Sequence, residues 1–354
     1  MAVDESFWSG RRVLVTGHTG FKGAWLTLWL GEMGAEVTGF ADGVPTTPSL
    51  FELAGLREML PTVWGDVRDY DAVLGAIRES SPEVVIHMAA QPFVRRSFSQ
   101  PRETYETNVM GTVNVLEAVR LTPGVSVVIN VTSDKCYENL EHGRPFREQD
   151  AKGGHDPYSN SKGCAELVAD AYRCSFFSSD QSPTQLASGR AGNVIGGGDW
   201  GEDRLIPDIM RGALVGETVK IRNPDSVRPW QHVLNPLSGY LKLVEMLWHQ
   251  PGTSLGWNFG PEAGDALTVG EIAERVGDLW PGDLSFEIDA GPHPHEATLL
   301  RLDSSKAHTE LGWAPTWNLE QGLEATVAWY AALRDGRDMA EVSVEQIRAF
   351  GDES

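Results

Sequence analysis

The sequence has little cysteine, a shortage of positive charge and no long apolar run. Its three cysteines, Cys136, Cys164 and Cys174, stand at spacings that fit neither a disulfide framework nor a metal site. Lys and Arg number 29 against 50 Asp and Glu, and the resulting net charge of −21 disfavours nucleic acid and anionic membranes as partners. No apolar run reaches transmembrane length, and the first residues lack the pattern of a signal peptide. These absences favour a protein of the reducing cytoplasm without a metal site.

The length and composition are those of an ordinary globular chain. With 354 residues, of which 41% are hydrophobic, the chain can form one large or two unequal domains with a substantial core. If a ligand is anionic, its site must be a local cluster of Arg and Lys on an acidic body.

A glycine-rich stretch near the N-terminus organises the rest of the chain. Residues 13–16 form an apolar run of strand length, and Gly17, Gly20 and Gly23 follow at the spacing G-x-x-G-x-x-G before an apolar helical stretch at 24–30. Glycines let a backbone approach a pyrophosphate, and the N-terminus of the following helix offers free N–H groups and a positive dipole end. The strand, turn and helix together predict a dinucleotide site, whereas a tight turn without a ligand would not need three glycines.

Short apolar strands alternate with helical segments over residues 11–195. Residues 36–40, 62–64, 84–90 and 125–131 are predicted strands, and the nearly continuous apolar run at 84–90 is typical of a central parallel strand. This alternation predicts an α/β fold, a Rossmann-type doubly wound parallel sheet, with a smaller α/β C-terminal substrate domain.

The predicted domain boundaries follow a change in composition near residue 196. A dinucleotide-binding domain is expected at 1–195, with later segments near 220–240 and 256–262 returning to it, and a mainly substrate-binding domain at 196–335. Residues 336–354 are expected to form an acidic tail consisting of a surface helix and a frayed end.

Two acidic residues are candidates for holding the nucleoside parts of a dinucleotide. Asp42 follows the second strand, where an acid can bind the ribose hydroxyls of NAD and would repel the additional phosphate of NADP. The alternative for Asp42 is a solvated loop acid. Asp66 stands where a contact to adenine is plausible, and equally where it would cap the helix starting near Asp69.

A tyrosine and a lysine four residues apart carry the strongest chemical signal. Tyr158 and Lys162 lie one turn apart on the same face of a predicted helix. An ammonium close to a phenol favours the phenolate, so Tyr158 is expected to accept a proton from a sugar hydroxyl as hydride leaves for a nicotinamide. The pair alone is common by chance, but here it follows a glycine-rich turn and a buried strand that ends at Thr132 and Ser133.

These motifs resemble the extended short-chain dehydrogenase/reductase superfamily. The resemblance rests on Thr-Gly-His-Thr-Gly-Phe-Lys-Gly, His-Met-Ala-Ala-Gln, Thr132–Ser133, Tyr158-x-x-x-Lys162, and the segments 190–196, 204–207 and 228–233. Within it the chain is similar to nucleotide-sugar 4,6-dehydratases. Residues 7–8, 45–51 and 132–138 are most similar to the subgroup that acts on CDP-glucose. The resemblance implies NAD as cofactor and a nucleotide sugar as substrate, with C4 oxidation, C5/C6 elimination of water and return of the hydride to C6.

The resemblance also assigns roles to individual residues. Many relatives have Thr-Asp-Glu where this chain has Ser133, Asp134 and Lys135, so Asp134 is the expected acid at the C6 hydroxyl and Lys135 the expected base at C5. The implied catalytic set is Ser133, Asp134, Lys135, Tyr158 and Lys162. The implied cofactor set is Gly17, Thr19, Gly20, Phe21, Lys22, Gly23, Asp42, Asp66, Val67, Ala89, Ala90, Gln91, Asn108, Tyr158 and Lys162.

Substrate binding requires cations for a diphosphate. Asn193, Arg204, Arg228 and Arg301 are the candidates, although each arginine is also a candidate for an ordinary ion pair. By analogy with the superfamily, the helices around 108–119 and 165–172 are expected to build a homodimer through a four-helix bundle, possibly within a tetramer. The alternatives are a dehydratase for GDP- or dTDP-sugars, an NAD-dependent epimerase, and a catalytically silent NAD-binding protein.

Overall fold

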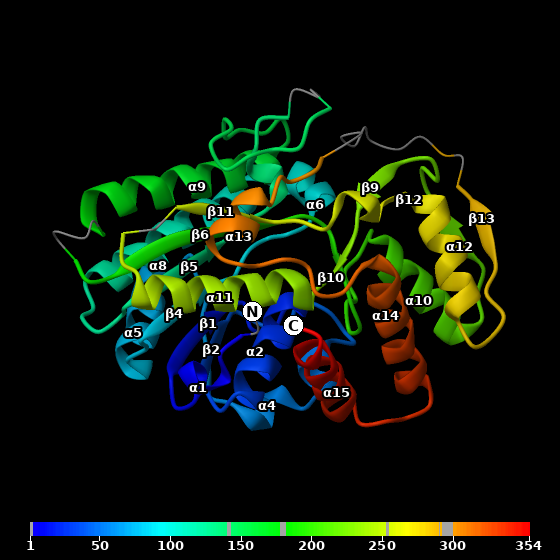
Figure 1. The fold of residues 1–354 in the computed structure, drawn as a ribbon, viewed down its shortest axis with the longest axis horizontal. Coiled ribbons are helices and arrows are strands. Elements are labelled where there is room, and N and C mark those ends of the chain that lie inside the picture. Colours follow the sequence, from blue (N-terminus) through cyan, green and yellow to red (C-terminus); the bar gives the residue numbers. More distant parts are fainter. Residues whose placement is uncertain (1–2, 140–142, 178–181, 253–254, 290, 292–299) are drawn as a thin grey trace.

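A seven-stranded parallel sheet forms the centre of the protein (Figure 1). The computed structural model describes residues 3–139, 143–177, 182–252, 255–289, 291 and 300–354. The strand order is β11-β6-β5-β4-β1-β2-β3. The strands are β1 (Arg12–Thr16), β2 (Glu36–Ala41), β3 (Thr62–Trp64), β4 (Val84–His87), β5 (Val127–Val131), β6 (Gln185–Ala191) and β11 (Gly256–Phe259). The order reverses between β1 and β4, which is where ligands of doubly wound sheets bind.

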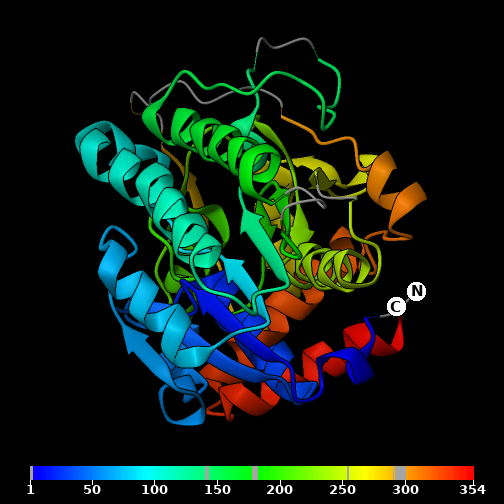
Figure 2. The same ribbon diagram turned by 90° about the vertical axis from the view of Figure 1, so that its left-hand side faces the viewer.

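Each central strand is apolar on both faces because helices cover both sides of the sheet. In β1, Val13 and Val15 join one core cluster and Leu14 joins the other. The Leu14 side is packed against α5 (Tyr70–Ser80), α8 (Gly111–Arg120) and α9 (Pro157–Phe176). The opposite side is packed against α1 (Glu5–Trp8), α2 (Phe21–Glu32) and α11 (Leu234–His249). Figure 2 shows α8 and α9 side by side on the face toward the viewer.

Shorter helices connect these elements. They are α3 (Leu50–Leu53), α4 (Leu56–Met59), α6 (Val94–Ser99), α7 (Pro101–Tyr105), a π-helical turn at Glu106–Met110 that joins α7 to α8, and single 3-10 turns at Asp134–Cys136 and Ala263–Asp265. The 3-10 turn at Asp134–Cys136 follows β5 directly, so the predicted acid and base lie at the carboxyl edge of the sheet.

The C-terminal part contributes small two-stranded sheets and further helices. The helices at Leu205–Val215, Val269–Leu279 and Leu319–Arg334 pack together at one end of the molecule, whereas the helix at Ser305–Glu310 packs against β11 (Figure 1). The strands are β7 (Val194–Ile195), β8 (Val219–Ile221), β9 (Val227–Pro229), β10 (Gln231–His232), β12 (Ala266–Thr268) and β13 (Phe286–Ile288). The helices are α10 (Leu205–Val215), α12 (Val269–Leu279), α13 (Ser305–Glu310) and α14 (Leu319–Arg334). β7 pairs with β10, β8 with β13, and β9 with β12.

Two segments were expected to return to the N-terminal part, near residues 220–240 and 256–262, and the structure differs at the start of the first. β11 adds to the edge of the main sheet and α11 packs on it, but β8 pairs with β13 in the C-terminal part and does not return to the main sheet.

The last helix is docked on the body of the protein. The surface helix expected in the acidic tail is present, and one of its faces is buried. α15 (Met339–Asp352) buries Met339, Val342, Ile347 and Phe350, and Phe350 lies edge-on to Trp29 and Trp317 at ring distances of 5.5 and 5.2 Å. The acidic residues occupy the outer face of this amphipathic helix, which places the C-terminus beside the N-terminal part (Figure 1).

Candidate active site

Two glycines of the glycine-rich turn are closely packed against the backbone, and the third borders open space. Gly17 has φ +73°, and a Cβ there would lie 2.7 Å from the backbone nitrogen of Ala89. A Cβ at Gly23 would lie 2.2 Å from the carbonyl oxygen of Gly17. At Gly20 the nearest atom would be 3.4 Å away, so this glycine leaves the start of α2 open toward the cavity. The first N–H groups of α2 therefore face a space that suits a pyrophosphate.

The acidic candidates lie where β2 and β3 end, and both line the same cavity. The hydroxyl of Thr19 donates to the carbonyl of Gly43 at 2.7 Å, which ties the glycine-rich turn to the loop that carries Asp42. Asp66 accepts from the guanidinium of Arg68 at 2.8 Å, and this contact holds the pKa of the Asp66 carboxyl below its usual range. Asp69, not Asp66, caps α5. Asp66 thus lies at the cavity wall as the partner of Arg68.

Most of the predicted cofactor residues share this wall, but two do not. Val67, Ala89 and Ala90 line the cavity. Gln91 and Asn108 are buried behind it: the Asn108 side chain accepts from the backbone N–H of Gln91 at 2.8 Å and donates to Ser161 at 2.9 Å. Their amides hold the loop after β4 against α9, so the expectation that they contact the cofactor is corrected to a supporting role.

Tyr158 and Lys162 lie on the first turns of α9 and face the cavity beside Ser133. A hydrogen bond with Ser133 favours the Tyr158 phenolate, but burial dominates and raises the pKa of Tyr158 to about 12. Burial lowers the pKa of Lys162 to about 8, and the Glu166 carboxylate opposes this change. The expectation that Lys162 brings the phenol close to working pH is therefore not met in the protein alone, because desolvation of the phenolate outweighs its neighbours.

The acid and base candidates follow β5. Asp134 is buried and accepts a hydrogen bond from the Ser133 hydroxyl at 2.7 Å. Lys135 is partly exposed and lines the cavity, as does Asn193. A Cβ on Gly192 would approach an Asp134 oxygen to 3.0 Å, so the loop after β6 packs directly against the acid.

Lys22 has an environment that the motif did not reveal. Its ammonium donates to the hydroxyl of Tyr240 at 3.0 Å. Burial, with the positive charges of Lys162 and Arg204 nearby, lowers the pKa of Lys22 to about 7, while Asp134 acts in the opposite direction. Lys22 thus belongs electrostatically to the catalytic group as well as to the glycine-rich turn.

The predicted substrate arginines differ in position. Arg204 lines the cavity and forms two contacts to the carboxylate of Asp199 at 3.0 and 2.9 Å. Arg228 also lines the cavity. Arg301 is not among the described residues that line it, although its neighbour Leu300 is. The predicted site of Arg301 is therefore corrected: its backbone carbonyl accepts from the N–H of Phe146 at 2.8 Å in a bridge beside the cavity.

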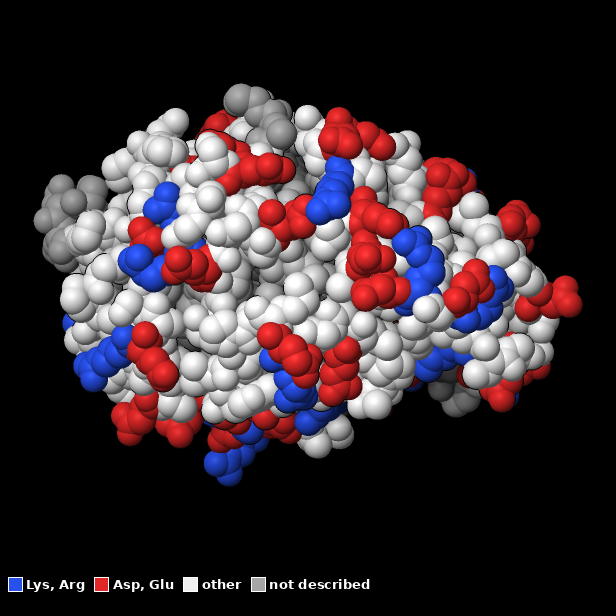
Figure 3. Space-filling model, turned by 90° about the horizontal axis from the view of Figure 1, so that it is seen from below, with Lys and Arg blue, Asp and Glu red and all other residues white. Residues whose placement is uncertain are grey.

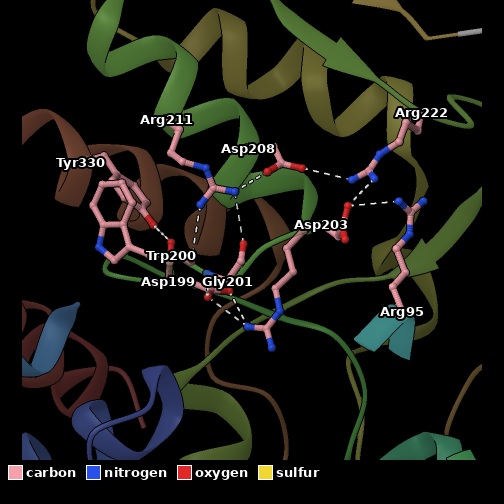
Figure 4. A network of polar contacts seen from close by, with 10 residues as sticks. Arg95, Asp199, Trp200, Gly201, Asp203, Asp208, Arg211, Arg222 and Tyr330 are labelled. Atoms are coloured by element: carbon pink, nitrogen blue, oxygen red, sulfur yellow. Dashed lines mark hydrogen bonds and ion pairs between the residues drawn. The ribbon is translucent and has the colours of Figure 1, made fainter. Parts of the chain in front are cut away.

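Sequence reasoning missed several arginines that the fold brings to this region. Arg95, Arg211 and Arg222 line the same cavity and form ion pairs with Asp203 and Asp208 (Figure 4). No spacing along the chain connects residue 95 with residue 222, because they meet only through the folding of the C-terminal part onto the sheet edge.

All these elements enclose one large cavity of about 1970 Å³. It runs from the glycine-rich turn past Tyr158 to β8 and β9. The open Gly20 position, the start of α2 and the acid at the end of β2 fit the pyrophosphate and ribose of NAD. In the other half, the arginines fit an anionic substrate.

Neither a metal site nor a membrane-crossing helix is found within the described ranges. No group of three His, Cys, Asp or Glu is arranged to hold a metal ion there, and no described helix is long and apolar enough to span a membrane. On the face drawn in Figure 3, Lys and Arg side chains stand among Asp and Glu.

Comparisons with known proteins agree with this geometry. The profile of the GDP-mannose 4,6 dehydratase family matches residues 14–326. A CDP-glucose 4,6-dehydratase of Salmonella typhimurium is 53% identical over 352 residues, covering 98% of this chain and 98% of that protein. A dTDP-glucose 4,6-dehydratase of Streptomyces griseus is 30% identical, covering 90% and 93%.

Solved structures share the fold. The dTDP-glucose 4,6-dehydratase DesIV of Streptomyces venezuelae, with NAD bound, has a TM-score of 0.76 at 25% identity and covers 93% of this chain and 99% of that chain. The UDP-glucose 4-epimerase of Thermus thermophilus in complex with NAD has a TM-score of 0.75 at 25% identity, covering 90% and 99%. With Tyr158, Lys162 and the buried Asp134 gathered at the edge of a doubly wound sheet, the chain belongs to the GDP-mannose 4,6 dehydratase family of NAD-dependent nucleotide-sugar enzymes.

Proposed function

We propose that this protein is a CDP-glucose 4,6-dehydratase, which converts CDP-D-glucose to CDP-4-keto-6-deoxy-D-glucose and water. The observation that carries the proposal is the buried Asp134 next to Ser133 and Tyr158, because an epimerase needs the tyrosine and lysine but no acid at this place. The 53% identity to a CDP-glucose 4,6-dehydratase over nearly the whole chain supports the choice of the CDP sugar.

The first task of the site is oxidation at C4 of glucose. Tyr158 accepts the proton of the C4 hydroxyl, and Ser133 hydrogen-bonds to the phenol. Lys162, one turn further along α9, has the role of favouring the phenolate by its positive charge during the reaction. NAD, when bound along Gly17–Gly23 and Asp42, supplies the hydride acceptor for C4 and the hydride donor for C6. The resulting 4-keto group acidifies the proton at C5.

The second task is elimination of water. Lys135 removes the C5 proton while Asp134 protonates the departing C6 hydroxyl, so that the C5–H and C6–O bonds break and a C5–C6 double bond forms. After C6 is reduced, a proton returns to C5. Asp134 is suited to its part because it lines the cavity while its side chain is almost entirely shielded from bulk solvent.

A panel of nucleotide sugars tests the proposal. The protein is incubated with NAD and with CDP-glucose, dTDP-glucose or GDP-mannose, and each product is analysed by mass spectrometry for loss of one water. We expect this loss with CDP-glucose at a rate far above the others. Loss of water only from the dTDP or GDP sugar would move the protein to another substrate of the family, and an isomer of unchanged mass would indicate an epimerase.

We further propose a homodimer formed through α8 and α9. These helices lie side by side (Figure 2) and expose Met110, Leu121, Leu167 and Phe176, which are 42–56% accessible. Paired with the same face of a second copy, they would form a four-helix bundle. Sedimentation equilibrium tests this: we expect a dimer for the protein and a monomer for Leu167→Lys.

The cytoplasm is the proposed compartment. Three cysteines that form no disulfide, one of them the fully buried Cys136, support a reducing environment. Fractionation of the source cells with an antibody against the protein tests this.

A further inference from the structure

An aspartate joins two arginines from different parts of the fold across the substrate half of the cavity. Asp203, in the loop before α10, accepts through one carboxylate oxygen from Arg95 of α6 at 3.2 Å and from Arg222, which follows β8, at 2.6 Å (Figure 4). All three residues line the cavity. The bridge therefore connects the sheet edge to the C-terminal part directly over the space where a substrate must enter.

Asp203 is held at this place only weakly. Its side chain is 44% exposed, and ion pairs of this exposure contribute little to stability. Its backbone has φ +60°, a region that residues other than glycine adopt rarely. A ligand with a more strongly binding anionic group can therefore displace the Asp203 carboxylate from the two arginines.

The two arginines are arranged as they would be around a phosphate. Two guanidinium groups converge on a single oxygen atom, and guanidinium binds phosphate oxygens in the same manner as carboxylate oxygens. Arg204, the residue after Asp203, lines the same cavity as Tyr158 and is close enough to interact with it electrostatically. A diphosphate attached to a sugar at Tyr158 would come next along the cavity.

We propose that Arg95 and Arg222 bind the diphosphate of the nucleotide-sugar substrate, and that Asp203 occupies their place in the ligand-free protein and is displaced when the substrate binds. The inference rests on the proposed function for the identity of the substrate. It also explains how a protein with a net charge of −21 keeps a cluster of arginines in a cavity: internal carboxylates neutralise the cluster until a stronger anion arrives.

The competing explanation makes the opposite prediction. If Asp203 is a fixed strap that shapes the site, removing its charge loosens the arginines and weakens ligand binding. If Asp203 competes with the ligand, removing its charge strengthens binding. The sign of the change in affinity therefore separates the two.

The experiment is a double-mutant cycle read out by calorimetric titration with CDP in the presence of saturating NAD. The variants are Asp203→Asn, Arg222→Gln and the double variant. Asp203→Gly also removes the carboxylate, and glycine adopts the positive φ of this position without strain. Glu202→Gln is the matched control, since Glu202 is the adjacent acid and lines the same cavity. Thermal melting of each variant verifies that it is folded.

We expect Asp203→Asn and Asp203→Gly to lower the dissociation constant of CDP by about three- to tenfold. Arg222→Gln should raise it about tenfold, and the gain from Asp203→Asn should be clearly smaller in the Arg222→Gln background, because only Arg95 is then left to be freed. Glu202→Gln should change it less than twofold. Weaker binding by both Asp203 variants, or an equal gain in the presence and absence of Arg222, overturns the proposal, because the latter indicates only a general field effect.

Turnover of CDP-glucose by the unaltered protein is measured in parallel. If the protein binds CDP with the expected cycle but does not dehydrate CDP-glucose, the proposed function fails and the displacement of Asp203 by a nucleoside diphosphate stands. If it dehydrates CDP-glucose and the cycle shows no coupling, the function stands and the displacement fails.

Discussion

Glu166 and Arg190 form a buried ion pair at 2.6 Å, with 1% and 2% of their side chains exposed. Glu166 lies eight residues after Tyr158 on α9, and Arg190 lies on β6 near the substrate loop. Glu166 also accepts from the hydroxyl of Thr132, the residue before Ser133. One carboxylate thus ties together the catalytic helix, the segment with the acid and base, and the strand that leads to Asn193.

Replacing Glu166 by Gln should strongly destabilise the protein. The change leaves the Arg190 guanidinium buried without its counter-charge, which typically costs about 3–5 kcal/mol. Denaturant unfolding followed by circular dichroism measures the loss. The double variant Glu166→Gln/Arg190→Met should regain part of it, because the orphaned charge is gone. Equal stability of the single variant and the unaltered protein would contradict the assigned role.

The same variant should change the pH dependence of catalysis. Glu166 opposes the burial that lowers the pKa of Lys162 to about 8, so its neutralisation should lower this pKa further. Lys162 would then lose its positive charge at a lower pH, and activity should decline earlier on the alkaline side. Turnover rates between about pH 6 and 10 measure the shift. An unchanged alkaline limb would show that Lys162 does not sense Glu166.

Lys135→Met should separate oxidation from elimination. Without its amine the site keeps Tyr158 and Lys162 for C4 chemistry but lacks the proposed C5 base, so dehydration should fall by at least about a hundredfold. Reduced nicotinamide should accumulate and is measured by its absorbance. Lys242→Met is the control, because Lys242 lies on α11 and is not among the described residues that line the cavity. Full turnover by Lys135→Met would exclude Lys135 as the base.

Lys22 should make the stability of the ligand-free protein depend on pH. Its pKa is about 7 in the folded state and about 10.4 in an unfolded chain, so the burial penalty is fully present below pH 7 and is relieved as the pH rises toward 10. Lys22→Met should therefore be more stable than the unaltered protein by about 1–3 kcal/mol at pH 6, and this advantage should disappear near pH 10. Urea unfolding across this range measures it. Parallel stability curves for the two proteins would contradict the buried state of Lys22.

Phe350→Ala should destabilise the fold although Phe350 lies only four residues before the last residue of the chain. Its ring is fully buried between Trp29 and Trp317, and truncation of such a ring usually costs about 3–5 kcal/mol. Arg348→Ala, on the exposed side of the same helix, should change stability by less than about 1 kcal/mol. Similar melting temperatures for the two variants would indicate that α15 is only loosely attached.

The local patterns of the chain were enough to predict the central fold and the place of Tyr158 and Lys162 beside the glycine-rich turn. Strand and helix periodicities are short-range properties, and so are the glycine spacing at 17–23 and the i, i+4 relation of Tyr158 and Lys162. Because parallel strands place their carboxyl ends at one edge, these segments were expected to meet, and in the structure they do.

Tertiary structure alone decided which distant residues share an environment. The bridge from Arg95 through Asp203 to Arg222, the pair of Glu166 with Arg190, and the docking of Phe350 on Trp29 join residues 19 to 321 positions apart. The low pKa of Lys22 depends likewise on burial and on charges brought near by folding. Sequence determined the elements and the chemistry they carry, and packing determined which charges are buried, paired or left for a ligand, because desolvation and ion pairing depend on three-dimensional neighbours.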